Sequence, residues 1–129
     1  MHYNAGIIGA GIIALDQLTK RYIEHSRPEL LIANTGGLWG MRASPSVLLL
    51  LSLVIICGLF YGYLKSNSYQ QRVAIMLVLG GIVSNMLDRI FSGAVRDFIN
   101  VGWWPAFNFA DAAIVCGVFW FIWLCWRKK

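Results

Sequence analysis

Four long apolar runs constrain what this chain can fold into. They cover about residues 3–18, 47–64, 73–90 and 110–126, and the charged side chains gather mostly between them. A helix rises about 1.5 Å per residue, so a run of roughly 20 residues crosses a hydrocarbon core of about 30 Å. The runs are continuous and do not alternate with polar residues, which favours lipid over an aqueous core. We therefore predict an all-α integral membrane protein with four transmembrane helices.

The composition agrees with this class. Of the 129 residues, 58% are hydrophobic and 13% are charged, whereas a soluble domain carries about 25% charged residues. The length predicts one domain over residues 1–129. The net charge of +5 comes from scattered cations that form no basic patch interleaved with aromatics, which argues against nucleic-acid binding. The N-terminal run lacks a basic leader, so we expect it to be retained as a span.

The orientation follows from where the cations lie. Four spans put both termini on one side, with five cations on that side and six on the other. The count decides nothing, but the "RKK" block at 127–129 directly abuts the last run, which favours cytoplasmic termini. The segment 28–42 is apolar, rich in glycine and too short to span. It predicts a strand and a tight turn on the outer surface.

Four of the six acidic residues lie at or just beyond the ends of apolar runs. They are Asp16, Asp88, Asp97 and Asp111. On the four-span topology, all four of these ends face the same side. Ionisable groups near a bilayer are costly, about 2.5–3.5 kcal/mol at a helix centre, and tend to be functional. The four aspartates are therefore the main candidates for chemistry.

Asp16 and Asp88 also have a structural explanation. Asp16 precedes Lys20 by four residues, the spacing of a helical ion pair that suits a helix C-terminus. Asp88 and Arg89 lie together at the end of the third run and would stabilise the end of that helix. Structural and functional roles both remain open for these residues.

Asp111 has a structural explanation too, so its role also remains open. Asp111 lies three residues after Asn108, the spacing of a capping box at the start of the fourth helix. Asp97 follows a glycine turn and has no comparable structural explanation. Two carboxylates at close range share one proton, because both cannot ionise easily. Such a pair activates water with one member and protonates a leaving group with the other.

Other chemistries fit less well. Thr19 and Lys20 are adjacent, an arrangement in which a hydroxyl nucleophile with a lysine base is an alternative. A small transporter is an alternative of another class, but it calls for an ionisable residue deep within a span. The runs contain none in their interiors.

Five short motifs occur in an order that resembles lipoprotein signal peptidase, the signal peptidase II family of bacterial aspartyl intramembrane proteases. They are "DQLTK" (16–20), "NTGGLWG" (34–40), "GGIVSNMLDR" (80–89), "GAVRDF" (93–98) and "FNFADAAI" (107–114). The resemblance covers residues 16–114 and includes the four span boundaries at which the outer loops and the aspartates would lie. An inactive relative that binds precursors without cutting them would carry the same motifs.

The resemblance implies an aspartic endopeptidase in which Asp97 and Asp111 form the catalytic dyad. It implies that Asn34 and Gly36 shape the substrate-facing outer segment. The residues that would line or brace the site are Asp16, Lys20, Asn85, Asp88, Arg89 and Asn108.

The resemblance also implies a substrate, a fold and a location. The family removes the signal peptide from prolipoproteins, cutting before a cysteine that carries diacylglycerol, and it needs no metal or cofactor. Its fold has four transmembrane helices, a small periplasmic β-cradle and a short outer helical segment. We accordingly expect a monomer in the bacterial inner membrane, in contact with lipid, with its active site toward the outer face.

One residue departs from the family pattern beside the dyad. Arg96 directly precedes Asp97, where the family more often has an apolar residue. A cation turned inward at this position would lower the pKa of Asp97. On an extended segment it would instead point to the opposite side.

Overall fold

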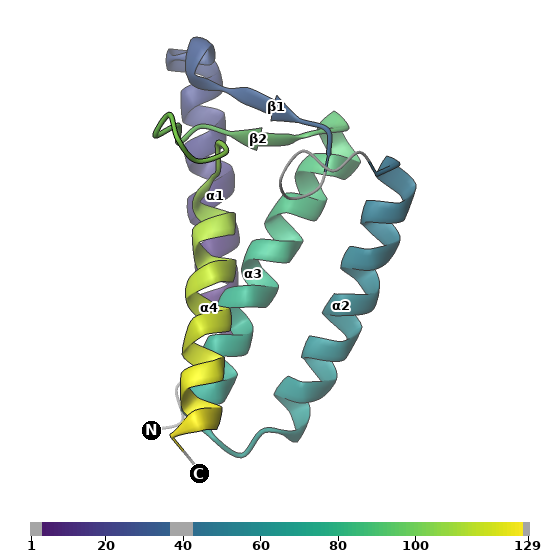
Figure 1. Cartoon of the computed structure of the whole chain (residues 1–129), viewed down its shortest axis with the longest axis vertical. Coiled ribbons are helices and arrows are strands. Elements are labelled where there is room, and N and C mark those ends of the chain that lie inside the picture. Colours follow the sequence, from purple (N-terminus) through teal and green to yellow (C-terminus); the bar gives the residue numbers. More distant parts are fainter. Residues whose placement is uncertain (1–3, 37–42, 128–129) are drawn as a thin grey trace.

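Four helices form an elongated bundle with a small sheet at one end (Figure 1). The computed structural model describes residues 4–36 and 43–127. The helices are α1 (Gly6–Ser26), α2 (Pro45–Lys65), α3 (Tyr69–Ser92) and α4 (Phe109–Trp126). The strands β1 (Ile32–Asn34) and β2 (Val95–Asp97) pair antiparallel, and the one-turn helix η1 (Pro28–Leu30) precedes β1. The sheet lies at the end of the bundle opposite both termini (Figure 1).

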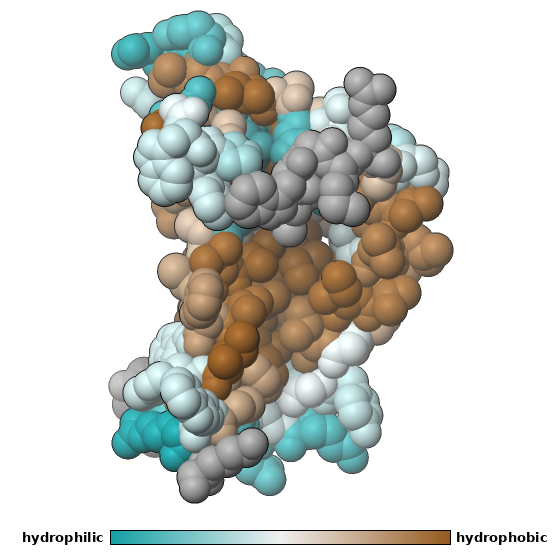
Figure 2. Space-filling model, in the orientation of Figure 1, coloured by the Kyte–Doolittle hydropathy of each residue, from teal (hydrophilic) through white to brown (hydrophobic). Residues whose placement is uncertain are grey.

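Three of the helices, α2, α3 and α4, are long and apolar enough to cross a membrane. Figure 2 shows the corresponding apolar band, with polar side chains at both ends of the molecule. Helix α1 has the same length as α2, 21 residues, but four charged side chains lie in its second half. From residue 6 onward, each predicted apolar run lies within a helix.

The predicted end of the first helix is wrong. The apolar run ends at about residue 18, but α1 continues to Ser26. Hydropathy marks where apolar side chains stop, whereas a helix stops where the backbone is blocked. Residue 27, directly before Pro28, is disfavoured in the helical region, and the helix ends there. The predicted strand in segment 28–42 is confirmed as β1, while the predicted turn at 37–42 lies outside the described residues.

Helix α3 lies at the centre and packs against α1, α2 and α4. Two adjacent glycines allow the closest approaches. A Cβ on Gly80 would collide with the backbone of Gly9 in α1, and a Cβ on Gly81 would collide with the carbonyl of Ala110 in α4. This close packing brings the sheet-side ends of α1, α3 and α4 together.

Gly93 redirects the chain from α3 into β2. It has a φ of 76°, the left-handed conformation that commonly ends helices and that glycine adopts at no steric cost. The strand β2 therefore starts directly over the end of α3, and Asp97 lies at its end.

Candidate active site

A pocket of about 400 Å³ opens where the sheet meets the helix ends. Its wall is apolar apart from a few polar side chains. These come from β1, α3, β2 and α4, and are Asn34, Asn85, Arg89, Asp97 and Asp111. The volume is within the range of small-ligand sites. Two of the predicted aspartates therefore face one cavity.

The Asp97 carboxylate is 1% exposed and accepts one amide hydrogen bond on each oxygen. Asn108 Nδ2 donates to Oδ1 at 2.8 Å, and Asn34 Nδ2 donates to Oδ2 at 3.2 Å. Burial raises the pKa of Asp97, and the negative charge of Asp111 raises it further. The hydrogen bond from Asn34 opposes this, and the resulting pKa is about 6.

The Asp111 carboxylate lies in the first turn of α4 and is held in the same manner. Asn85 Nδ2 donates to its Oδ1 at 2.8 Å, and the backbone N–H of Asn108 donates to its Oδ2 at 3.1 Å. In return the Asp111 N–H donates to Asn108 Oδ1 at 2.9 Å. The predicted capping box is confirmed, and its carboxylate also faces the pocket.

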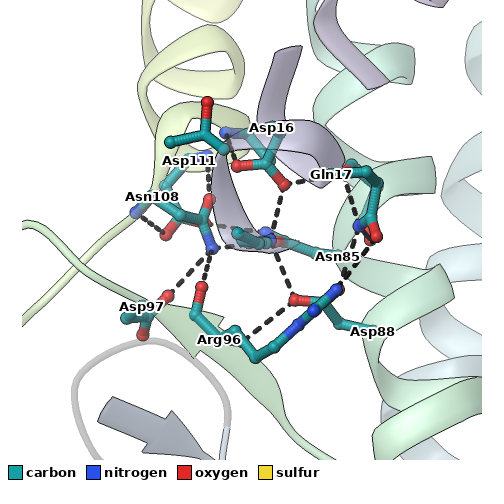
Figure 3. Close-up of polar contacts among 12 residues, drawn as sticks. Asp16, Gln17, Asn85, Asp88, Arg96, Asp97, Asn108 and Asp111 are labelled. Carbon is teal, nitrogen blue, oxygen red and sulfur yellow. Dashed lines mark hydrogen bonds and ion pairs between the residues drawn. The ribbon is translucent and has the colours of Figure 1, made fainter. Parts of the chain in front are cut away.

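Asn108 connects the two carboxylates. Its side chain donates to Asp97 and its backbone donates to Asp111. The same Nδ2 also donates to Asn85 Oδ1 at 3.0 Å, and Asn85 in turn donates to Asp111 (Figure 3). A closed set of amides therefore fixes both aspartates relative to each other.

A buried charged cluster lies behind these amides. Lys20 Nζ contacts Asp16 Oδ2 and lies 2.8 Å from Asp88 Oδ2, and all three side chains are fully buried. Lys20 also donates to Asn85 Oδ1 at 3.4 Å. Asp16 Oδ1 accepts from the Ala110 N–H of α4 at 3.1 Å. The predicted Asp16–Lys20 ion pair is confirmed, and it joins three helices.

Asp88 and Arg89 both lie near the end of α3, as predicted. The ion-pair partners of Asp88 are Lys20 and Arg96. Side chains at adjacent helical positions point about 100° apart, so the two face different neighbours. Arg89 lines the pocket instead.

Two further members of the cluster were missed by sequence reasoning. Ser84 Oγ donates to Asp16 Oδ2 at 2.7 Å, and Gln17 Nε2 donates to Ser84 Oγ at 3.0 Å and to Asp88 Oδ1 at 2.9 Å. The available signal was a buried serine inside an apolar run. By contrast, the Thr19 hydroxyl donates to the Leu15 carbonyl, so it does not form a nucleophile pair with Lys20.

The segment at the end of β1 also reaches the site. Asn34, at the end of β1, accepts from the Gly36 N–H at 3.0 Å while its amide group contacts Asp97. Both residues line the pocket. Arg96 points to the side of β2 opposite Asp97, toward Asp88 and Gln17 (Figure 3). The extended alternative for Arg96 is therefore the observed one.

Comparison with solved structures defines the class of protein. One structure of a bacterial membrane enzyme superposes with a TM-score of 0.86 at 26% identity, covering 96% of this chain and 88% of that chain. A second bacterial membrane enzyme gives a TM-score of 0.84 at 26% identity, covering 97% and 94%. The fold and the pocket thus define a helical membrane enzyme.

A family model described as signal peptidase (SPase) II matches residues 8–127, and the chain belongs to this family. A lipoprotein signal peptidase of Anaplasma phagocytophilum is 33% identical over 138 residues, covering 92% of this chain and 88% of the relative. That of Moorella thermoacetica is 34% identical, covering 90% and 86%. The protein is an aspartic-type peptidase of the membrane.

Proposed function

We propose that this protein is an aspartic endopeptidase of the bacterial inner membrane that removes the signal peptide from diacylglyceryl-modified prolipoproteins. Cleavage falls immediately before the lipid-bearing cysteine, and Asp97 and Asp111 activate the water. The names of the relatives supply the substrate class. The observation that carries the mechanism is that both carboxylates face one pocket and are fixed by one asparagine, Asn108.

The carboxylate pair can carry both proton transfers of hydrolysis. One ionised aspartate takes a proton from water as the water oxygen attacks the scissile carbonyl carbon. The other, protonated, aspartate gives its proton to the amide nitrogen as the carbon–nitrogen bond breaks. Each oxygen already accepts one N–H hydrogen bond, which leaves a lone pair for water or substrate. The bracing roles of Asn34, Asn85 and Asn108 follow from these contacts.

In the proposed topology α1 crosses the membrane in addition to α2, α3 and α4, and both termini lie in the cytoplasm. The sheet then forms a periplasmic cradle, η1 is the short outer helical segment, and the site faces outward. Three cation–aromatic pairs near the ends of α2, α3 and α4 that lie on the side of the termini support this orientation. They are Lys65 with Tyr61, Arg72 with Tyr63, and Arg127 with Trp123. The unit is one domain, residues 1–129, and acts as a monomer.

The proposed substrate is tested with the purified protein in detergent. We expect a diacylglyceryl-modified precursor to be cut before its modified cysteine, which mass spectrometry identifies from the product termini. The same precursor without its lipid should remain intact. Cleavage of the unmodified precursor would refute the lipid requirement, and an intact modified precursor would refute the substrate class.

The pH dependence of the free enzyme follows from the raised pKa of Asp97. Its pKa of about 6 lies above the ordinary value of 3.8, so the proton is held below about pH 6 and lost above it. A dyad that needs one proton loses its active form as that proton leaves. We expect kcat/KM to fall as pH rises through about 6, measured by initial rates at low substrate concentration. A kcat/KM that rises steadily between about pH 6 and pH 8 would contradict this assignment.

A further inference from the structure

Arg96 ties the strand that carries Asp97 to two helices. Its Nη2 donates to Asp88 Oδ1 at 2.8 Å and to Gln17 Oε1 at 3.0 Å, and its Nη1 donates to Glu24 Oε2 at 3.1 Å. Its backbone N–H donates to Asp88 Oδ2 at 2.9 Å. One residue of β2 is therefore bonded to α3 through Asp88, and to α1 through Gln17 and Glu24.

The strand β2 is short and pairs with one other strand in the described structure. Its ladder with β1 comprises only three residue pairs, and isolated two-stranded ribbons are marginally stable. The Arg96 side chain is 18% exposed and Asp88 is fully buried, so their contact is shielded from water. A planar guanidinium with several fixed donors holds a direction that a single ammonium does not. These contacts therefore restrict both the position and the tilt of β2 relative to α1 and α3.

We propose that Arg96 is a positioning residue for Asp97. By anchoring β2 to α1 and α3 from one face, it sets where the Asp97 carboxylate lies on the other face, toward Asp111. Consecutive residues of a strand point to opposite sides, so Arg96 acts without lining the pocket. This inference rests on the proposed function of Asp97 and Asp111. It assigns to Arg96 an effect on turnover and not on substrate binding.

The test compares Arg96→Met with Arg96→Lys in the full-length protein, purified in detergent and assayed with a diacylglyceryl-modified precursor. Methionine is similar in length but has no donors. Small misplacements of a reacting group lower rates steeply, so we expect Arg96→Met to reduce kcat about 10- to 100-fold. KM should stay within about twofold of the parent value, because the contacts that the substrate makes equally in the ground state and the transition state are unchanged. The kcat of Arg96→Lys should lie between those of the parent and of Arg96→Met, since a single ammonium can replace only part of the hydrogen bonds that the guanidinium makes.

Two controls separate positioning from general destabilisation. Rates are expressed per folded molecule, well below the unfolding temperature of each variant. Arg27→Met removes an exposed cation bonded to Glu29 near the same sheet, and its kcat should stay within about twofold of the parent. Glu24→Gln should lower kcat less in the Arg96→Met background than in the parent, because both changes remove one contact.

The outcomes distinguish this inference from the proposed function. Parent kcat in both Arg96 variants, or a raised KM at parent kcat, would overturn the positioning role. If Arg96→Met does not fold, Arg96→Lys decides: reduced kcat at parent KM supports the role, and parent kcat overturns it. Asp97→Asn is assayed alongside. If it still cleaves, the proposed function fails; if it is inactive while the Arg96 variants keep parent kcat, only this inference fails.

Discussion

Replacing Asp97 with asparagine is expected to lower kcat for a diacylglyceryl-modified precursor by about 10³- to 10⁴-fold, and Asp111→Asn should do the same. Asparagine keeps the size of the side chain but can neither take a proton from water nor return one to the leaving amine. Asp97 is buried at the pocket and Asp111 faces it from α4, so each substitution removes one half of the proton transfer. Initial rates of precursor cleavage measure the effect.

The fold should survive these two substitutions. An asparagine at either position can still accept one of the two amide hydrogen bonds described above, and the helix contacts are unaffected. Glu29→Gln is the matched control, because it neutralises an exposed carboxylate paired with Arg27. Its rate should stay within about twofold of the parent. Substantial turnover by Asp97→Asn or Asp111→Asn, with thermal unfolding like that of the parent, would refute the dyad.

Replacing Lys20 with methionine is expected to destabilise the protein by about 3–5 kcal/mol. The Lys20 ammonium is the shared partner of two fully buried carboxylates, Asp16 and Asp88. Without it Asp16 keeps only the Ser84 hydroxyl and the Ala110 N–H as donors. An uncompensated charge would then remain between the helices. Thermal unfolding in detergent, compared with the parent, measures the loss.

Two variants test whether the cause is the buried charge. Lys65→Met makes the same chemical change at an exposed lysine over the Tyr61 ring, where the expected loss is at most about 1 kcal/mol. Adding Asp16→Asn to Lys20→Met removes the orphaned carboxylate, so the double variant should be more stable than additivity predicts. Equal losses of stability for Lys20→Met and Lys65→Met would contradict the interpretation that Lys20 compensates buried carboxylates.

The sequence was sufficient to place the aspartates together. Run boundaries follow from hydropathy, and the spacing of Asn108 and Asp111 carries a capping box that is local to one turn. Both features depend on residues close in the chain, so a pattern can predict them. The motif resemblance then distinguished Asp97 and Asp111 from the other two aspartates, and the structure places these two at one pocket.

The contacts between helices could not be predicted in this way. Gly80 lets α1 approach α3 closely, with one particular face of each helix turned toward the other. This approach brings Lys20 to Asp88 and Gln17 to Ser84. Hydropathy gives the extent of an apolar run but not which side of the helix faces a neighbouring helix, since lipid and protein are both apolar.

The amide frame around the dyad has a consequence for the proton inventory of the site. Every donor that the described structure places on the four carboxylate oxygens is an asparagine side chain or a backbone N–H. Amides neither gain nor lose protons between acidic and alkaline pH. In the proposed mechanism, these hydrogen-bond donors therefore stay chemically unchanged while a proton moves from one aspartate to the other. A full catalytic cycle can then return the site to its starting state without resetting any neighbouring group.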